Sequence, residues 1–223
     1  MSENKVYKRF NIRYLILVLI AAVIICQIPP ISFDQVLKAK ALTVDWFTPS
    51  VSDMTQNFWD GGMISLSNLQ SGGVQVNWNN AITNVRIGVN RKTPLDGMAI
   101  QLDGLTAGEG SNANFAVLMA NDPLSSYDVE SKVIPALLFD TTNGQVFWMP
   151  NGHRVIDPNN GLKYDNIHNK TIEIVFEKGS GKYNVTLTVG SSVFKGVIPD
   201  SEMTGFSQFN ADNDVCALLT AWK

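Results

Sequence analysis

The chain has 223 residues, of which 45% are hydrophobic and 17% charged, and its net charge is −3. The apolar content excludes a disordered chain, and the length is sufficient to bury a full hydrophobic core. Ordinary numbers of glycine and proline, 17 and 9, exclude a collagen-like or low-complexity protein.

The N-terminus joins a basic flank to an apolar run. Four basic residues among the first thirteen precede residues 14–26, which carry no charge. This order is typical of a signal peptide. Extended to residue 33, the segment reaches the length of a membrane-spanning helix, although Pro29 and Pro30 are unfavourable inside a helix. Because the basic flank is expected to stay in the cytoplasm, the rest of the chain is predicted to be extracellular or displayed at the cell surface.

The export segment is predicted to end at Ala41. Ala39-Lys40-Ala41 has the small-x-small form that a signal peptidase accepts. The alternative is that the segment is retained and anchors the protein in the membrane through residues 14–33. The chain therefore divides into residues 1–41, a signal peptide or N-terminal membrane anchor, and residues 42–223, the exported domain.

The exported domain is acidic. Six of the 17 basic and two of the 20 acidic residues precede Leu42, which leaves 11 basic and 18 acidic residues and a net charge of −7. An acidic domain lacks the basic footprint that nucleic acids require, so no nucleic-acid partner is expected. Cys216 is the single cysteine after residue 41, and its apolar surroundings predict a buried, inert thiol.

Beyond residue 42 the sequence predicts an all-β domain. Short runs of strand-forming residues alternate apolar with polar side chains, as strands with one solvated face do. Small turn residues, such as Asn143-Gly144 and Asn151-Gly152, separate them. A short helix is predicted at 200–203, and no amphipathic stretch of ten or more residues follows Leu42. The absence of crossover helices favours antiparallel pairing in two packed sheets. The predicted strands cover residues 63–66, 73–78, 82–89, 98–102, 115–119, 134–139, 145–149, 171–177, 183–189, 192–198 and 215–222.

The order of these strands resembles the concanavalin A-like lectin and glucanase jelly rolls, which include laminin-G-like modules. The resemblance covers most of residues 45–222 and lies in runs such as Gly97-Met98-Ala99-Ile100-Gln101-Leu102-Asp103, Leu137-Leu138-Phe139-Asp140 and the hairpin from Lys170 to Val189. It implies a two-sheet antiparallel jelly-roll sandwich whose concave face or rim loops bind glycans. Fold alone does not establish such binding.

Catalytic signatures are absent from the sequence. The glycan-cleaving members of this superfamily carry Glu-x-Asp-x-Glu on one strand, whereas the nearest match here, Glu173 to Glu177, has Val175 in the middle. The two glutamates lie about 13 Å apart along a strand, beyond the spacing of a glycosidic acid pair. His153 and His168 show no triad or zinc spacing.

Aromatic residues beside polar turns are the candidate ligand-binding residues. Sugar rings stack on aromatic faces while polar side chains hold the hydroxyls. Trp148 stands near such a turn, and the candidates are Trp148, Asn151, His153, Arg154, Trp78 and Trp59. The alternative is that the tryptophans belong to the hydrophobic core.

Calcium is the one metal that the sequence suggests. Lectin-like sandwiches often carry a structural calcium on a loop, and Asp212, Asp214 and Asp157 lie in segments rich in Asp and Asn, which supply hard oxygen ligands. The alternative is that these segments are ordinary turns. No other cofactor is expected.

Three functions remain open from the sequence. The leading hypothesis is a lectin-like domain that binds a polysaccharide or other glycan without catalysis. A hydrolase with dispersed acidic residues is the second, and a structural or adhesive surface protein that contacts other proteins is the third.

Overall fold

The computed structural model describes residues 46–57, 64–78, 86–105, 114–123 and 132–222. Contacts divide the chain into two compact units, residues 1–46 and residues 47–223. The predicted export segment, residues 1–41, lies outside the described residues. In the part that is described, no helix is long and apolar enough to cross a membrane.

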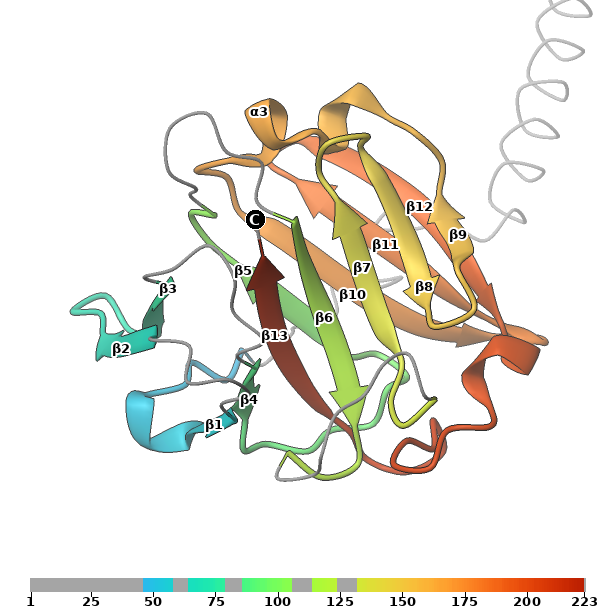
Figure 1. Ribbon diagram of the computed structural model, residues 1–223, viewed down its shortest axis with the longest axis horizontal. Coiled ribbons are helices and arrows are strands. Elements are labelled where there is room, and N and C mark those ends of the chain that lie inside the picture. The colour runs from blue at the N-terminus through green and yellow to red at the C-terminus, as the bar shows by residue number, and fades with distance from the viewer. Residues whose placement is uncertain (1–45, 58–63, 79–85, 106–113, 124–131, 223) are drawn as a thin grey trace, which may run out of the picture. The chain divides into compact units, whose positions relative to one another are not determined.

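Two antiparallel sheets form the body of the second unit, and Figure 1 shows β10, β11 and β12 behind β6, β7 and β8. In the seven-stranded sheet the order is β1 (Met54–Asn57), β4 (Arg86–Val89), β13 (Cys216–Trp222), β6 (Asn114–Ala120), β7 (Ala136–Asp140), β8 (Gln145–Met149) and β9 (His153–Ile156). In the four-stranded sheet it is β12 (Ser192–Pro199), β11 (Lys182–Val189), β10 (Ile172–Gly179) and β5 (Ala99–Leu102). The hairpin β2 (Ile64–Asn68) and β3 (Val74–Trp78) pairs separately.

Helical segments in the described regions are short. The helices are η1 (Val51–Asp53), η2 (Asn160–Leu162), α3 (Tyr164–Ile167) and η3 (Asp200–Met203). The predicted helix at 200–203 is confirmed as the 3₁₀ turn η3. The all-β fold class, with antiparallel strands in a two-sheet sandwich, is confirmed.

The core is formed by apolar side chains that alternate with polar ones along the strands. In β10 the side chains of Ile172, Ile174 and Phe176 are buried, and the glutamates of the same strand lie on the opposite face, as predicted. β6 differs, because its side chains from Phe115 to Ala120 are buried on both faces of the sheet. Phe115 stacks on Phe139 of β7 with 4.2 Å between ring centroids.

Two strands, β1 and β9, were not predicted from the sequence. The run His153-Arg154-Val155-Ile156 places two polar residues before two apolar ones and therefore does not alternate. It becomes a strand because the Asn151-Gly152 turn, where Gly152 has a φ of 66°, folds it back onto β8. A register shift between Val146 and Phe147 interrupts this pairing.

Candidate functional site

Trp148 does not occupy the exposed position that stacking requires. It lies in β8 and is 0% exposed. Its Nε1 donates a hydrogen bond of 2.9 Å to the backbone oxygen of Glu202, and the ring of Phe209 packs edge-on with 6.5 Å between centroids. The predicted sugar-stacking role of Trp148 is contradicted, because protein encloses both faces of the ring and its one polar atom.

Asn151 and His153 point toward the segment from β12 to η3. The Asn151 Nδ2 donates a hydrogen bond to the carboxylate of Glu202. The His153 Nε2 lies 3.0 Å from the backbone oxygen of Val197 in β12. These contacts fasten the β8–β9 hairpin to η3 and to β12 of the four-stranded sheet. Ligand binding by these two residues stays a prediction.

The side chains of the other two tryptophans of the predicted site, Trp59 and Trp78, lie outside the described part of the chain. Trp59 lies outside the described residues. Trp78 ends β3, where its backbone pairs with Ile64, but its side chain is outside the described part of the chain.

Arg154 is placed on the solvent side of the seven-stranded sheet, opposite Phe147 of β8. Because side chains alternate along β8, Phe147 points away from the buried Trp148 and is half-buried. The Arg154 guanidinium lies 5.9 Å from the centroid of the Phe147 ring, within the range of a cation–π contact. Its Nη1 also pairs with the Asp157 carboxylate at 3.4 Å. One aromatic ring therefore reaches solvent here beside a charged pair.

A cleft with a volume of about 590 Å³ lies at the turn between β7 and β8, where the strand that carries Phe147 begins. Gln145 lines it and lies on the same face of β8 as Phe147, about 7 Å along the strand. Pro158, which follows Asp157, forms another part of the wall. We call it the amide cleft, and it is lined by Asn143, Gln145, Pro158, Asn159, Asn160 and Lys163.

A close approach of two backbones shapes the amide cleft. Gly144, in the turn between β7 and β8, has a φ of 69°. A β-carbon on this glycine would overlap the carbonyl oxygen of Asn159. The Asn159 N–H donates to the Gly144 oxygen at 3.0 Å, and its side-chain oxygen accepts the N–H of Gly161 at 2.9 Å. The turn and the η2 segment are thus held together as one rim.

Asp140 fixes the other side of the same turn. Its Oδ1 accepts the backbone N–H groups of Thr142 and Asn143, each at 3.1 Å. Its Oδ2 accepts a hydrogen bond of 2.8 Å from Asn143 Nδ2. Three donors therefore satisfy this carboxylate within the turn, in the manner of an Asx turn.

Several polar groups of the amide cleft remain free to bind. Among the residues that the structure describes, the side chains of Gln145, Asn160 and Lys163 have no hydrogen-bond or ion-pair partner. The six lining residues include neither a carboxylate nor a histidine. Sequence reasoning named the Asn143-Gly144 turn and the Asx-rich segment at 157–161, but it could not show that they meet at one cleft.

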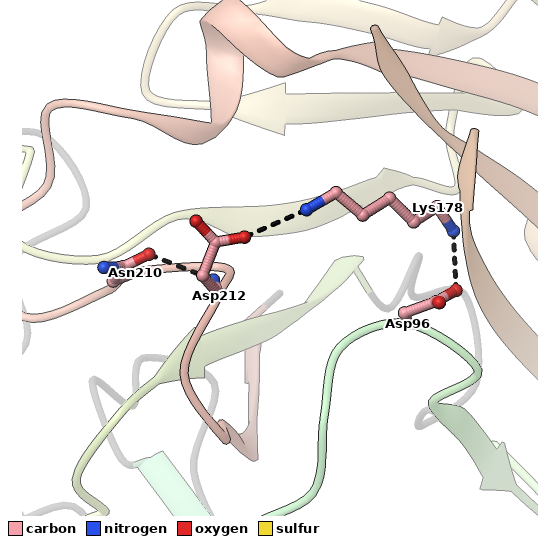
Figure 2. Close-up of polar contacts among 4 residues, drawn as sticks. All are labelled: Asp96, Lys178, Asn210 and Asp212. Atoms are coloured by element: carbon pink, nitrogen blue, oxygen red, sulfur yellow. Dashed lines mark hydrogen bonds and ion pairs between the residues drawn. The ribbon is translucent and has the colours of Figure 1, made fainter. Parts of the chain in front are cut away.

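Two of the three predicted calcium ligands, Asp212 and Asp157, lie in separate ion pairs. The Nζ of Lys178 in β10 lies 2.9 Å from the Asp212 carboxylate, and the Lys178 backbone N–H donates to Asp96 at 2.8 Å (Figure 2). Asp157 is paired with Arg154, as described above. Within the described ranges, no group of three or more His, Cys, Asp or Glu side chains is placed to hold a metal. Calcium binding stays a prediction.

Asn121, which follows β6, organises the loop that contains Asp212 and Asp214. The Asn121 Oδ1 accepts the N–H of Asn210 at 2.7 Å, and its Nδ2 donates to the backbone oxygens of Asn210 and Asp214 at 3.2 and 3.0 Å. The Asn210 side chain in turn accepts the N–H of Asp212 at 3.0 Å (Figure 2). Protein side chains therefore hold this loop in place.

Comparisons with known proteins found similar solved structures. No family model and no curated protein sequence matches the chain. Lectin I from Ulex europaeus, solved with the methyl glycoside of α-L-fucose, is 13% identical, with a TM-score of 0.49 over 76% of this chain and 84% of that one. A legume lectin-like domain from Entamoeba histolytica is 14% identical, with a TM-score of 0.49 over 77% and 82%. The carbohydrate-binding module CBM66 from Bacillus subtilis is 14% identical, with a TM-score of 0.38 over 77% and 92%.

Proposed function

We propose that the exported domain is a lectin-like, non-catalytic carbohydrate-binding module that contacts its ligand through the amide cleft and the ring of Phe147 on the same face of β8. The observation that supports this most directly is the set of unpaired polar side chains in an open cleft, one of which, Gln145, lies on the same face of β8 as the half-buried ring of Phe147. The lining supports a binding role rather than a catalytic one, because none of its six residues carries a carboxyl group for glycosidic cleavage.

The chemistry of the amide cleft matches that of a sugar. Each hydroxyl of a sugar both donates and accepts hydrogen bonds, and a carboxamide does the same through its NH₂ and its oxygen. Gln145 and Asn160 offer such groups without losing a hydrogen bond to the protein. The half-buried ring of Phe147 and the flat face of Pro158 offer apolar surface to the C–H side of a pyranose.

Glycan arrays followed by calorimetry test this proposal. The chain is expected to bind at least one polysaccharide, and Gln145→Ala and Phe147→Ala are expected to weaken that binding while the melting temperature stays close to that of the unmodified protein. Thr188→Ala is the matched control, because Thr188 lies on the outer face of the four-stranded sheet, in β11. The absence of binding to any glycan, or equal weakening by Thr188→Ala, would overturn the proposal.

The two other functions predict different results. A hydrolase with dispersed acidic residues would release reducing sugars from the bound polysaccharide, and we expect none. An adhesive protein would capture a protein partner through contacts that soluble glycan does not compete away. Release of the partner by the glycan would instead favour the carbohydrate-binding role.

Export is part of the same proposal and has its own test. The basic flank and the apolar run of residues 14–26 support it. A secreted form whose N-terminal sequence begins at Leu42 would support cleavage after Ala41. A protein that keeps residues 1–41 and sediments with membranes would support anchoring through residues 14–33. Recovery of the intact chain in the cytoplasmic fraction would contradict both.

A further inference from the structure

The amide cleft carries one uncompensated charge, and its sign is opposite to that of the domain. Lys163 is exposed and its Nζ makes no ion pair with any residue in the described ranges. No carboxylate lines the cleft, although acidic residues exceed basic ones by seven in residues 42–223. An ammonium group kept free of acidic neighbours attracts anions more strongly than one that is already paired.

Two acidic side chains of the surrounding turns, Asp140 and Asp157, already have partners. Three donors of its own turn occupy the Asp140 carboxylate. Asp157, next to Pro158 of the cleft, pairs with Arg154 at 3.4 Å. The polarity of the rim is therefore set by carboxamides and one lysine.

Packing also directs the Lys163 side chain along the rim. A β-carbon on Gly144 would lie 3.3 Å from the Cγ of Lys163, so the alkyl stem runs beside the β7–β8 turn. The N–H of Lys163 donates to Asn160 at 3.1 Å, which fixes its backbone in the same rim. A stem held in this way lets the ammonium group reach a ligand in the cleft at reduced entropic cost.

We propose that the amide cleft selects anionic glycans, meaning polysaccharides with carboxylate groups such as hexuronates, over neutral ones, with Lys163 binding the carboxylate and the carboxamides of Gln145 and Asn160 binding the hydroxyls. This inference rests on the proposed function, because it names the class of glycan for the same cleft. The preference arises at Lys163, since the net charge of the domain repels anions.

Matched polymers separate this preference from general sugar binding. The full chain in non-ionic detergent is titrated with polygalacturonate, alginate and hyaluronan, each compared with the same polymer after chemical reduction of its carboxylates to alcohols. At least one acidic polymer is expected to bind more tightly than its reduced form. Lys163→Gln is expected to weaken its binding about fivefold, the upper range for one solvent-exposed ion pair. Binding of the reduced form is expected to change little, and Lys163→Arg is expected to restore much of the loss.

The control is Lys182→Gln, which removes the same charge from an exposed position in β11. Equal weakening by Lys182→Gln would assign the effect to net charge and overturn the inference. Tighter binding of the reduced polymers, or loss of both forms in Lys163→Gln, would overturn the anionic preference while leaving the carbohydrate-binding proposal intact. If none of the acidic, reduced or neutral polymers bound, the carbohydrate-binding proposal itself would fail.

Discussion

Gly144 and Asn159 approach each other so closely that no side chain fits between them, and this contact forms the rim of the amide cleft. The two residues belong to different turns. A hydrogen bond of 3.0 Å from the Asn159 N–H to the Gly144 oxygen joins them.

Gly144→Ala is expected to destabilise the protein and to weaken glycan binding. Gly144 and Gly152 have similar φ angles, 69° and 66°, so alanine at either position carries the left-handed strain of about 1–2 kcal/mol. A β-carbon at Gly152 meets no atom within 4 Å, whereas one at Gly144 overlaps Asn159 and adds an overpacking cost of about 1–3 kcal/mol. Chemical denaturation and calorimetry of both variants measure the difference. Equal losses of stability and binding in the two variants would contradict this role for Gly144.

Gly196→Ala is expected to separate the two sheets where β12 passes β9. A β-carbon at Gly196 would overlap the backbone oxygen of Val155 in β9, and backbone cannot give way as a flexible side chain can. We expect a loss of stability of about 1–3 kcal/mol or failure to fold. Gly179→Ala is the control, because Gly179 also lies in a strand and the atom closest to its added β-carbon is the side-chain amide nitrogen of Asn184 at 3.2 Å. A thermal melt of Gly196→Ala that matches that of Gly179→Ala would refute the close approach.

Lys178 is expected to titrate above the usual range for lysine. Its hydrogen bond to the Asp212 carboxylate favours the protonated amine and raises the pKa of Lys178. The contribution to stability is therefore complete below the unfolded lysine pKa, about 10.4, and is lost as the pH rises through the higher folded pKa. Asp212→Asn should lower this pKa, as read from NMR titration of the lysine Cε signals. Asp214→Asn, in the same loop, should leave it unchanged, and an equal shift in both variants would contradict the pairing.

Cys216 is expected to resist thiol reagents in the folded protein. It is 0% exposed in β13, and burial raises the pKa of its thiol, which lowers the fraction of reactive thiolate. A Cys26→Ser variant leaves Cys216 as the only thiol. Its reaction with a disulfide reagent at pH 8 should be slow in buffer and rapid in denaturant. Rapid reaction in buffer would show that β13 is open to solvent.

Calcium binding at the loop from Asn210 to Asp214 can be tested by metal removal. The sequence predicts that calcium raises the melting temperature and that a chelator lowers it again. Because the Asp212 carboxylate is paired with Lys178 at 2.9 Å, a calcium ion there would have to displace the ammonium group. Lys178→Ala should then strengthen the calcium effect. Melting temperatures that are equal with calcium and with chelator, in both the unmodified protein and Lys178→Ala, would contradict the prediction.

The positions of most strands along the chain could be predicted because alternation and turn chemistry are local properties. The run Thr171 to Glu177 alternates apolar and polar residues, and the structure places β10 over Ile172–Gly179. The pattern failed at His153–Ile156, where pairing with β8 makes a strand that the residues alone do not indicate.

The candidate binding site could be predicted from the sequence less well than the strands, because it depends on tertiary contacts. The sequence identified Trp148 as an aromatic residue near a polar turn, but only the packing of η3 and Phe209 decides that its ring is buried and that Phe147, one residue earlier, faces solvent. The sequence pattern likewise indicated turns in the Asn-rich segments at 143–144 and 157–161. These turns are separated along the chain, and they meet at the amide cleft only in the folded state. Neither residue type nor spacing encodes this contact. The close approach of Gly144 and Asn159 fixes it.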